Sequence, residues 1–168
     1  MRVLSVNDLP PSRRCDGWSM AEPQLTDDFK EFLRSLNANG VDYLLVGGYA
    51  VAVHGYPRAT VDMNVWIRSS RANAEATVQA LRAFGFDLPE LKAEVFLSPR
   101  ALVRFGVPPF RIEVMTTIDG VAYDACRPRA LTVDIDGIPV PIIALDDLKA
   151  NKLAAGRHKD LADLEHLP

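Results

Sequence analysis

Apolar residues recur at helical spacing between residues 26 and 39. They fall every three or four positions, which makes one side of a helix apolar and the other polar. The residues of this apolar side are Phe29, Phe32, Leu33 and Leu36. Thr26 is a favoured N-cap, two aspartates follow it in the first turn, and Gly40 is suited to end the helix. The pattern therefore predicts an amphipathic helix over residues 26–39.

Glycine and serine mark the ends of further helices. Gly47 and Gly48 open a short helix after an apolar run, and Ser70 caps a longer one. Gly85 and Gly156 are placed to end two helices, because glycine adopts the left-handed C-cap conformation without strain. We expect helices over residues 47–54, 70–84, 93–97, 145–155 and 160–167, with one or two helical turns in 120–126.

Short apolar runs bounded by turn residues predict strands. Their ranges are 43–46, 61–68, 102–107, 111–115, 131–135 and 138–143. Asp136 and Gly137 between the last two runs are a strong hairpin signal. Pro139 and Pro141 alternate in the second arm, which predicts an edge strand because proline cannot donate a ladder hydrogen bond.

The order of these elements predicts the fold class. Helices and strands alternate in the first half, and strands are followed by helices in the second. This order favours an α/β (α+β) fold in which helices flank a mixed sheet, as a single domain over residues 25–168. Residues 1–24 show no period and contain Pro10, Pro11 and Gly17, so we expect an irregular N-terminal arm there.

The second predicted strand has one apolar and one polar face. Side chains two positions apart on a strand share a face. One face carries Met63, Val65 and Ile67, and the other carries Asp62, Asn64 and Trp66. Burying a carboxylate without a partner costs several kcal/mol, roughly. The polar face is therefore expected to meet a metal ion or a polar ligand.

Composition narrows the class of protein. The chain has 168 residues, of which 48% are hydrophobic, enough for a packed core. Its formal net charge of -3 provides no overall basic field for nucleic acid. Cys15 and Cys126 are expected to be free thiols in a reducing compartment. No apolar run approaches the roughly 18 residues that span a bilayer, and no signal segment is evident. We expect a cytoplasmic protein without a membrane association.

Several motifs occur together in one order. Gly47 and Gly48 are followed, after 13 residues, by Asp62-Met63-Asn64. This arrangement resembles the signature of the nucleotidyltransferase (polymerase-beta-like) superfamily. The segments VGGYAVAVHGYPRAT, RIEVMT and NKLAAGRHKDLADLE are similar to those of small bacterial nucleotidyltransferase-like proteins related to the AbiEii toxin group. The resemblance covers about residues 26–167.

The resemblance implies a metal-dependent transfer of a nucleoside monophosphate from a nucleoside triphosphate. The acceptor is a hydroxyl on RNA, a protein or a small molecule. Asp62, Asn64 and Glu113 are the implied ligands of magnesium, a cation that prefers hard oxygen atoms. Asp62 and Glu113 are the implied catalytic residues, and Glu113 can also act as general base toward the hydroxyl.

The same resemblance implies a nucleotide-binding set. Gly47 and Gly48 let backbone N–H groups approach phosphate oxygens. Lys152 either reaches the triphosphate or lies on a solvated helix face. Arg58 and Thr60 either contact the nucleotide or shape the turn before the acidic strand.

Asn64 departs from the family pattern, which has a second carboxylate at this position. Asparagine supplies one neutral oxygen and lacks the negative charge, so a magnesium site would be weakened. The alternatives are an altered metal arrangement, a slow enzyme, an engineered inactivating change, or a degenerate fold that acts as a binding or antitoxin-like module. The resemblance also implies a toxin or antitoxin partner protein, or a homodimer.

Other polar residues favour structural interpretations. Asp160 and Asp163 predict an ion-pair network with neighbouring basic residues near the C-terminus. His54 lies among small residues and is expected to be packed and hydrogen-bonded. Trp66 is expected to be a packing or rim residue, with stacking on a base as the alternative.

Overall fold

The computed structural model describes residues 25–107 and 110–168. The predicted arm, and with it Cys15, lies outside the described residues. The helices are α1 Asp27–Ala38, α2 Gly47–Val53, α3 Arg71–Phe84, α4 Ala93–Leu97, α5 Tyr123–Cys126, a 3₁₀ turn Arg127–Arg129, α6 Leu145–Ala155 and α7 His158–His166. The strands are β1 Tyr43–Val46, β2 Asp62–Ile67, β3 Leu102–Val107, β4 Phe110–Met115, β5 Leu131–Ile135 and β6 Ile138–Ile142.

The predicted helix caps are confirmed. Thr26 accepts a hydrogen bond from the backbone N–H of Phe29, and Ser70 accepts one from the N–H of Asn73. Gly85 follows α3 with a φ of 117° and Gly156 follows α6 with a φ of 62°. Both helices therefore end where a residue without a Cβ allows the chain to turn away.

All six strands form one mixed sheet in the order β3-β4-β2-β1-β6-β5. β2 is parallel to β4 and antiparallel to β1, and β1 is parallel to β6. The α/β class with a mixed sheet flanked by helices is thus confirmed. The register of the β2–β4 pair places Asp62 opposite Arg111 and Asn64 opposite Glu113.

The predicted edge strand is wrong, because β6 lies between β1 and β5. β6 pairs with β1 only at the end of β6, where Ile142 lies opposite Leu45. The carbonyl of Leu45 accepts a hydrogen bond from the N–H of Ile143, the next residue. The prolines precede this point, so they remove no donor from the bridge to β1. The carbonyl of Pro139 instead accepts from Asn37 at the end of α1.

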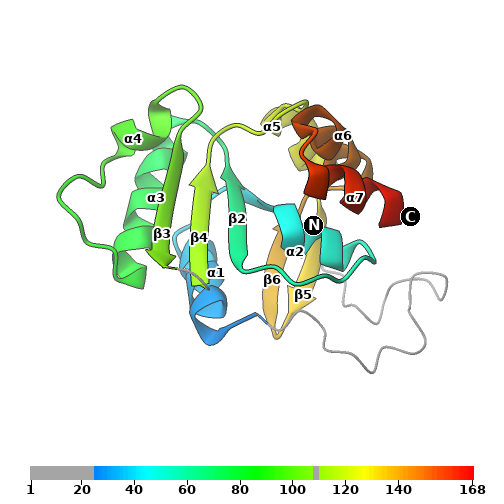
Figure 1. The fold of residues 1–168 in the computed structure, drawn as a ribbon. Coiled ribbons are helices and arrows are strands. Elements are labelled where there is room, and N and C mark those ends of the chain that lie inside the picture. Colours follow the sequence, from blue (N-terminus) through cyan, green and yellow to red (C-terminus); the bar gives the residue numbers. More distant parts are fainter. Residues whose placement is uncertain (1–24, 108–109) are drawn as a thin grey trace.

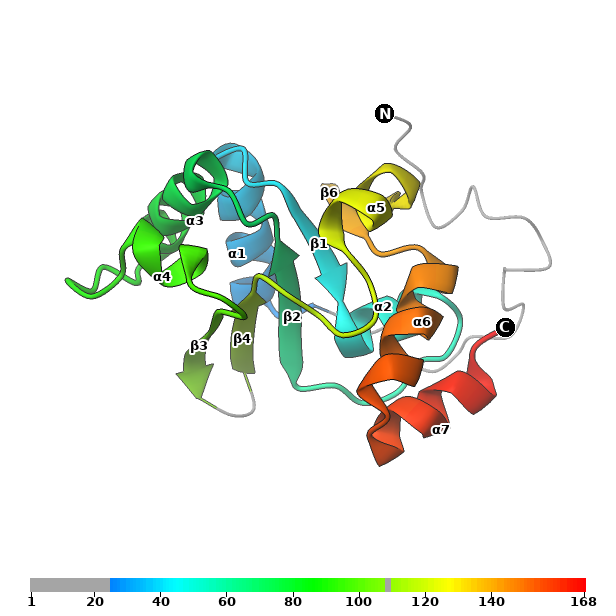
Figure 2. The ribbon, with the colours of Figure 1, turned by 90° about the horizontal axis from the view of Figure 1, so that it is seen from above.

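The helices lie in two groups on opposite faces of the sheet. α1, α3 and α4 cover one face, whereas α6 and α7 lie toward the other face, on the side of β2 away from β3 (Figures 1 and 2). Met63, Val65 and Ile67 are fully buried and belong to the hydrophobic core. The predicted apolar face of β2 is therefore part of the core, and its polar face looks the other way. No helix in the described ranges has the length and apolar character needed to cross a membrane.

Candidate functional site

The glycine pair packs directly against β2. Gly47 has a φ of 70°, and a Cβ placed on it would lie 2.4 Å from Asn64 Oδ1. A Cβ on Gly48 would lie 2.5 Å from Thr60 Oγ1. Both distances are far below van der Waals contact, so a side chain at either position would displace its neighbour. The glycines therefore bring the start of α2 against the polar face of β2.

Three polar side chains share this face of the sheet. Asp62 and Asn64 project from β2, and Glu113 projects from the neighbouring parallel strand β4. All three are partly buried, as the alternating pattern predicts. Asn64 Nδ2 donates to Glu113 Oε2 at 2.7 Å. The register of β2 and β4 brings the predicted metal ligands together, although Glu113 is distant in sequence from Asp62 and Asn64.

Two arginines hold the carboxylates: Arg111, the first residue of the RIEVMT segment, for which the sequence predicted no role, and Arg104, which lies outside the motifs. Arg111 donates to both oxygens of Asp62, with Nε at 3.1 Å from Oδ1 and Nη2 at 2.8 Å from Oδ2. Arg104 Nε donates to Glu113 Oε1 at 2.7 Å. The hydrogen bonding to Asp62 is the largest cause that raises the pKa of Arg111 above its ordinary value. With the bond from Asn64, all four carboxylate oxygens have a partner within the protein. The alternation of Arg104 with the apolar residues Val103 and Phe105 is the sequence signal for its place on this face.

Lys152 is the centre of a buried ion-pair network. Its side chain is 4% exposed, and its ammonium nitrogen lies 3.1 Å from Asp160 Oδ1 and 2.7 Å from Asp163 Oδ2. The interpretation of Lys152 as a residue of a solvated helix face is therefore wrong. Its charge is also shared by two aspartates rather than directed freely at a ligand. The predicted network at Asp160 and Asp163 is confirmed, with Lys152 as an additional member.

Two arginines complete this network. Arg58 forms two hydrogen bonds with Asp163, at 2.6 and 2.9 Å, and Arg157 Nε lies 2.6 Å from Asp160 Oδ2. Burial acts to raise the pKa of both aspartates, but the hydrogen bonds from these cations outweigh it and hold each pKa below its ordinary value. Because Arg58 precedes β2, the network ties the C-terminal helices to the segment that leads to Asp62.

The polar face of β2 forms one wall of a cavity of about 500 Å³. Its acidic lining residues are Asp62, Glu113, Asp119 and Asp160. Its basic lining residues are Arg58, Arg100, Arg104, Arg111, Lys152, Arg157 and Lys159. The cavity is thus more basic than acidic, although the whole chain is acidic. Its volume lies within the range of sites for cofactors and nucleotides, roughly 300 to 1,000 Å³.

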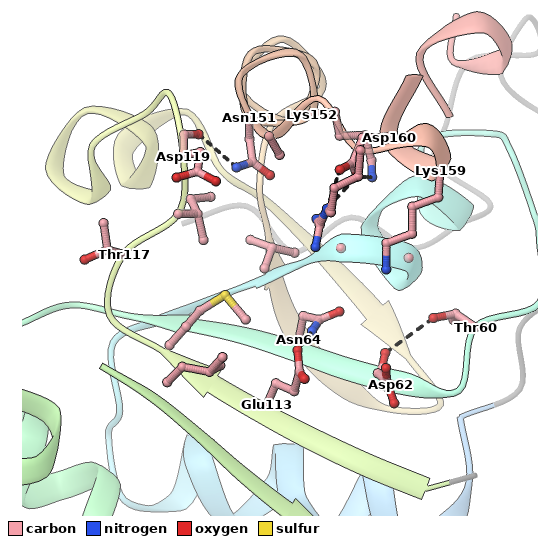
Figure 3. Close-up of a pocket in the computed structure, with 18 of the residues that line it drawn as sticks. Thr60, Asp62, Asn64, Glu113, Thr117, Asp119, Asn151, Lys152, Lys159 and Asp160 are labelled. Carbon is pink, nitrogen blue, oxygen red and sulfur yellow. Dashed lines mark hydrogen bonds and ion pairs between the residues drawn. The ribbon is translucent and has the colours of Figure 1, made fainter. Parts of the chain in front are cut away.

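Lys159 differs from the other cations of the cavity. It is exposed on α7, and its side chain extends into the cavity toward the polar face of β2 (Figure 3). Within residues 25–107 and 110–168 its ammonium group has no ion-pair partner, whereas each of the other six lining cations has one. Lys159 is therefore the cation best placed to meet an anionic ligand. The segment NKLAAGRHKDLADLE includes Lys159, but Lys152 was the residue predicted from the sequence to reach the triphosphate.

Two other polar residues are structural. Trp66 is buried, donates from Nε1 to the carbonyl of Thr116 at 3.2 Å, and packs edge-on against Tyr123. His54 Nε2 lies 2.7 Å from the carbonyl oxygen of Ile143. The packing interpretation is thus confirmed for both, and neither ring is available to stack on a base.

The donor set suits a hard cation in part. Asp62, Glu113 and Asn64 offer carboxylate and amide oxygens, the ligand type that magnesium prefers. The described part of the chain has no cluster of three or more His, Cys, Asp or Glu side chains that could hold a metal ion. The oxygens therefore fit an ion that keeps water and substrate oxygens in its shell, rather than one held by protein ligands alone.

Comparison with known proteins supports the fold. No protein-family model matches this sequence, and none of the curated proteins compared with it matches. Among solved structures, the chain is similar to a Thermotoga maritima protein described as a "putative nucleotidyltransferase". The TM-score is 0.56, the identity is 16%, and the match covers 81% of this chain and 87% of that one. At this identity the similarity shows a nucleotidyltransferase-like fold and nothing finer.

Proposed function

We propose that this protein is a metal-dependent nucleotidyltransferase whose active site is the cavity on the polar face of β2. The observation that carries the proposal is the meeting of Asp62 and Glu113 on adjacent parallel strands, beside the glycine pair. The nucleotidyltransferase-like fold supports it. The substrates are a nucleoside triphosphate and a hydroxyl group on RNA, a protein or a small molecule.

Asp62 and Glu113 are the proposed metal ligands, with the amide oxygen of Asn64 as a weaker third. Magnesium bound there would polarise the transferred phosphoryl group and neutralise the leaving pyrophosphate. In the reaction the acceptor oxygen forms a bond to the α-phosphorus, and the bond from that phosphorus to the bridging oxygen breaks. Glu113 is the proposed base that takes the proton from the acceptor hydroxyl.

The triphosphate is proposed to lie between the glycine pair and α7. Gly47 and Gly48 line the cavity and have no side chain of their own, although Asn64 and Thr60 pack against them. Lys159 extends into the same space and supplies a positive charge that has no ion-pair partner within the described ranges. Lys152 acts indirectly, because its ammonium holds Asp160 and Asp163. Arg58 and Thr60 lie beside Gly48 and are proposed to shape this part of the cavity.

The test combines binding with product release. Calorimetry with magnesium and each nucleoside triphosphate measures binding, and a coupled assay measures pyrophosphate. We expect binding that Asp62→Ala abolishes, and pyrophosphate release that rises in Asn64→Asp because the missing charge is restored. The absence of nucleotide binding at millimolar concentration in the parent protein would overturn the proposal.

A second function is favoured by Asn64 and by the two arginines that hold the carboxylates. A site whose acids already have protein partners is suited to binding without chemistry, as in a degenerate antitoxin-like module. Nucleotide binding without pyrophosphate release, in both the parent protein and Asn64→Asp, would support this function over the first. An associated toxin or antitoxin protein stays a prediction, and co-purification of the native chain with a second protein would test it.

A further inference from the structure

The carboxylates of the cavity are balanced without any bound ion. Arg111 forms a two-bond pair with Asp62, and Arg104 pairs with Glu113, so two positive groups offset two negative groups. Asn64 adds a neutral donor to Glu113. A divalent cation added to this arrangement would bring two positive charges that nothing in the immediate set offsets.

A cation and the arginines compete for the same oxygens. Magnesium binds oxygen at roughly 2.0 to 2.1 Å and tolerates little distortion of its shell. Arg111 already donates to both oxygens of Asp62, so an ion that takes the lone pairs facing the guanidinium displaces it. The move is feasible because the side chains of Arg111 and Arg104 are 32% and 58% exposed, and each can leave its acid while remaining in water. Lys152, which is buried, has no such freedom.

A triphosphate would provide the released guanidiniums with new partners. Guanidinium binds phosphate in the same two-bond geometry as carboxylate. We propose that Arg111 and Arg104 are internal counter-ions that exchange partners, binding Asp62 and Glu113 in the free protein and phosphate oxygens when a divalent cation takes their place. The inference rests on the proposed function and adds two phosphate-binding residues to it.

The exchange couples the two ligands. The cation alone must break ion pairs and leave two guanidiniums unpaired, whereas the cation with a triphosphate re-pairs them. Each ligand therefore strengthens the binding of the other, and linkage requires that the factor be the same in both directions. The charges of the parent site therefore favour binding of the metal–triphosphate complex over binding of the cation alone or of the triphosphate alone.

Arg111→Gln separates this mechanism from a simple structural role. Calorimetry with magnesium chloride alone, and then with inorganic tripolyphosphate plus magnesium, avoids the unknown base. The variant should bind magnesium alone about three- to tenfold more tightly, since an ion pair worth on the order of 1 kcal/mol no longer competes. It should bind magnesium tripolyphosphate about three- to tenfold more weakly, because one phosphate ligand is lost.

Arg100→Gln is the matched control. It removes the same charge from the same cavity, but Arg100 pairs with Asp119 and not with a proposed metal ligand. We expect its magnesium affinity to change less than about twofold, as for a screened surface charge. Arg104→Gln provides a second arm through Glu113, which Arg111 also approaches at 3.8 Å, should Arg111→Gln fold poorly.

The exchange predicts that Arg111→Gln binds magnesium alone more tightly and magnesium tripolyphosphate more weakly than the parent protein. Equal or weaker magnesium binding in both Arg111→Gln and Arg104→Gln would overturn the exchange, and so would equal tightening in Arg100→Gln. If the parent protein binds no nucleotide, the proposed function fails. The titration with magnesium alone still shows in that case whether the arginines compete with the ion.

Discussion

Lys152 provides the sharpest test of how the C-terminal helices are held. In Lys152→Met the buried aliphatic length is kept, but Asp160 and Asp163 lose the ammonium that they share. Removing one partner of a buried ion pair costs about 3 to 5 kcal/mol, because a buried charge is left uncompensated. Arg58 and Arg157 still contact the aspartates, so we expect about 3 kcal/mol, the lower end of that range.

The cost should depend on pH, with a definite sign. In the parent protein both aspartates have a lowered pKa, so their stabilising contribution is present above the unfolded value of about 3.9 and is lost as pH falls through the folded value. Without Lys152, desolvation raises the pKa of both groups. The variant then takes up protons at a higher pH than the parent, which relieves the buried charge. The difference in unfolding free energy is therefore largest near neutral pH and shrinks toward pH 4.

Urea unfolding at pH 7.0 and pH 4.5 measures this difference. With an m-value of roughly 2 kcal/mol/M, a loss of about 3 kcal/mol lowers the midpoint by about 1.5 M at neutral pH. Lys159→Met is the matched control, since Lys159 is exposed on the adjacent helix and has no ion-pair partner in the described ranges. Its unfolding free energy should stay within about 0.5 kcal/mol of the parent. A loss below about 1 kcal/mol in Lys152→Met at pH 7.0, or one equal at both pH values, would refute the reasoning.

Two further predictions concern packing and reactivity. Gly48→Ala should lower the free energy of unfolding by about 1 to 3 kcal/mol, because its Cβ would lie 2.5 Å from Thr60 Oγ1. Urea unfolding measures the loss, which should be smaller in a Thr60→Gly background; an alanine tolerated without loss contradicts the packing. Burial raises the pKa of the Cys126 thiol to about 11, so in a Cys15→Ser background an aromatic disulfide reagent at pH 8 should label the protein only after unfolding. Rapid labelling of the folded variant would show that Cys126 is accessible.

The elements of the fold follow from local signals. The caps at Thr26 and Ser70, the helical period of α1 and the hairpin residues before β6 each act within a few positions, so the sequence is enough to place them. The edge-strand prediction failed because proline excludes a ladder bond at its own position only. β1 pairs with β6 beyond the prolines, at Ile142, so β6 can have a neighbour on each side. This pairing could not be predicted locally, because β1 is distant from β6 in sequence.

The acidic residues of the site could be predicted from the sequence, but their ion-pair partners could not. The alternation along β2 places Asp62 and Asn64 on one face, and the motif adds Glu113. The partners come from elsewhere, since Arg58 meets Asp163 over a separation of 105 residues. No periodic pattern encodes such a pair, because it depends on how whole elements pack. For the same reason Lys152 was interpreted as a ligand or a solvated residue, and not as a buried structural cation.

Asn64 connects the ion pairs of the cavity with the question of catalysis. As an amide it donates to Glu113, so the face carries two acids that two arginines can balance. An aspartate at this position would abolish that donor and set a third negative charge beside Glu113, which disfavours the folded state unless a cation enters. Asn64→Asp should therefore melt at a lower temperature than the parent without magnesium and regain stability when magnesium is added. If the parent cavity is stable without an ion and the variant requires one, Asn64 determines the order of binding. The arginines then release the carboxylates only when the triphosphate binds together with its cation.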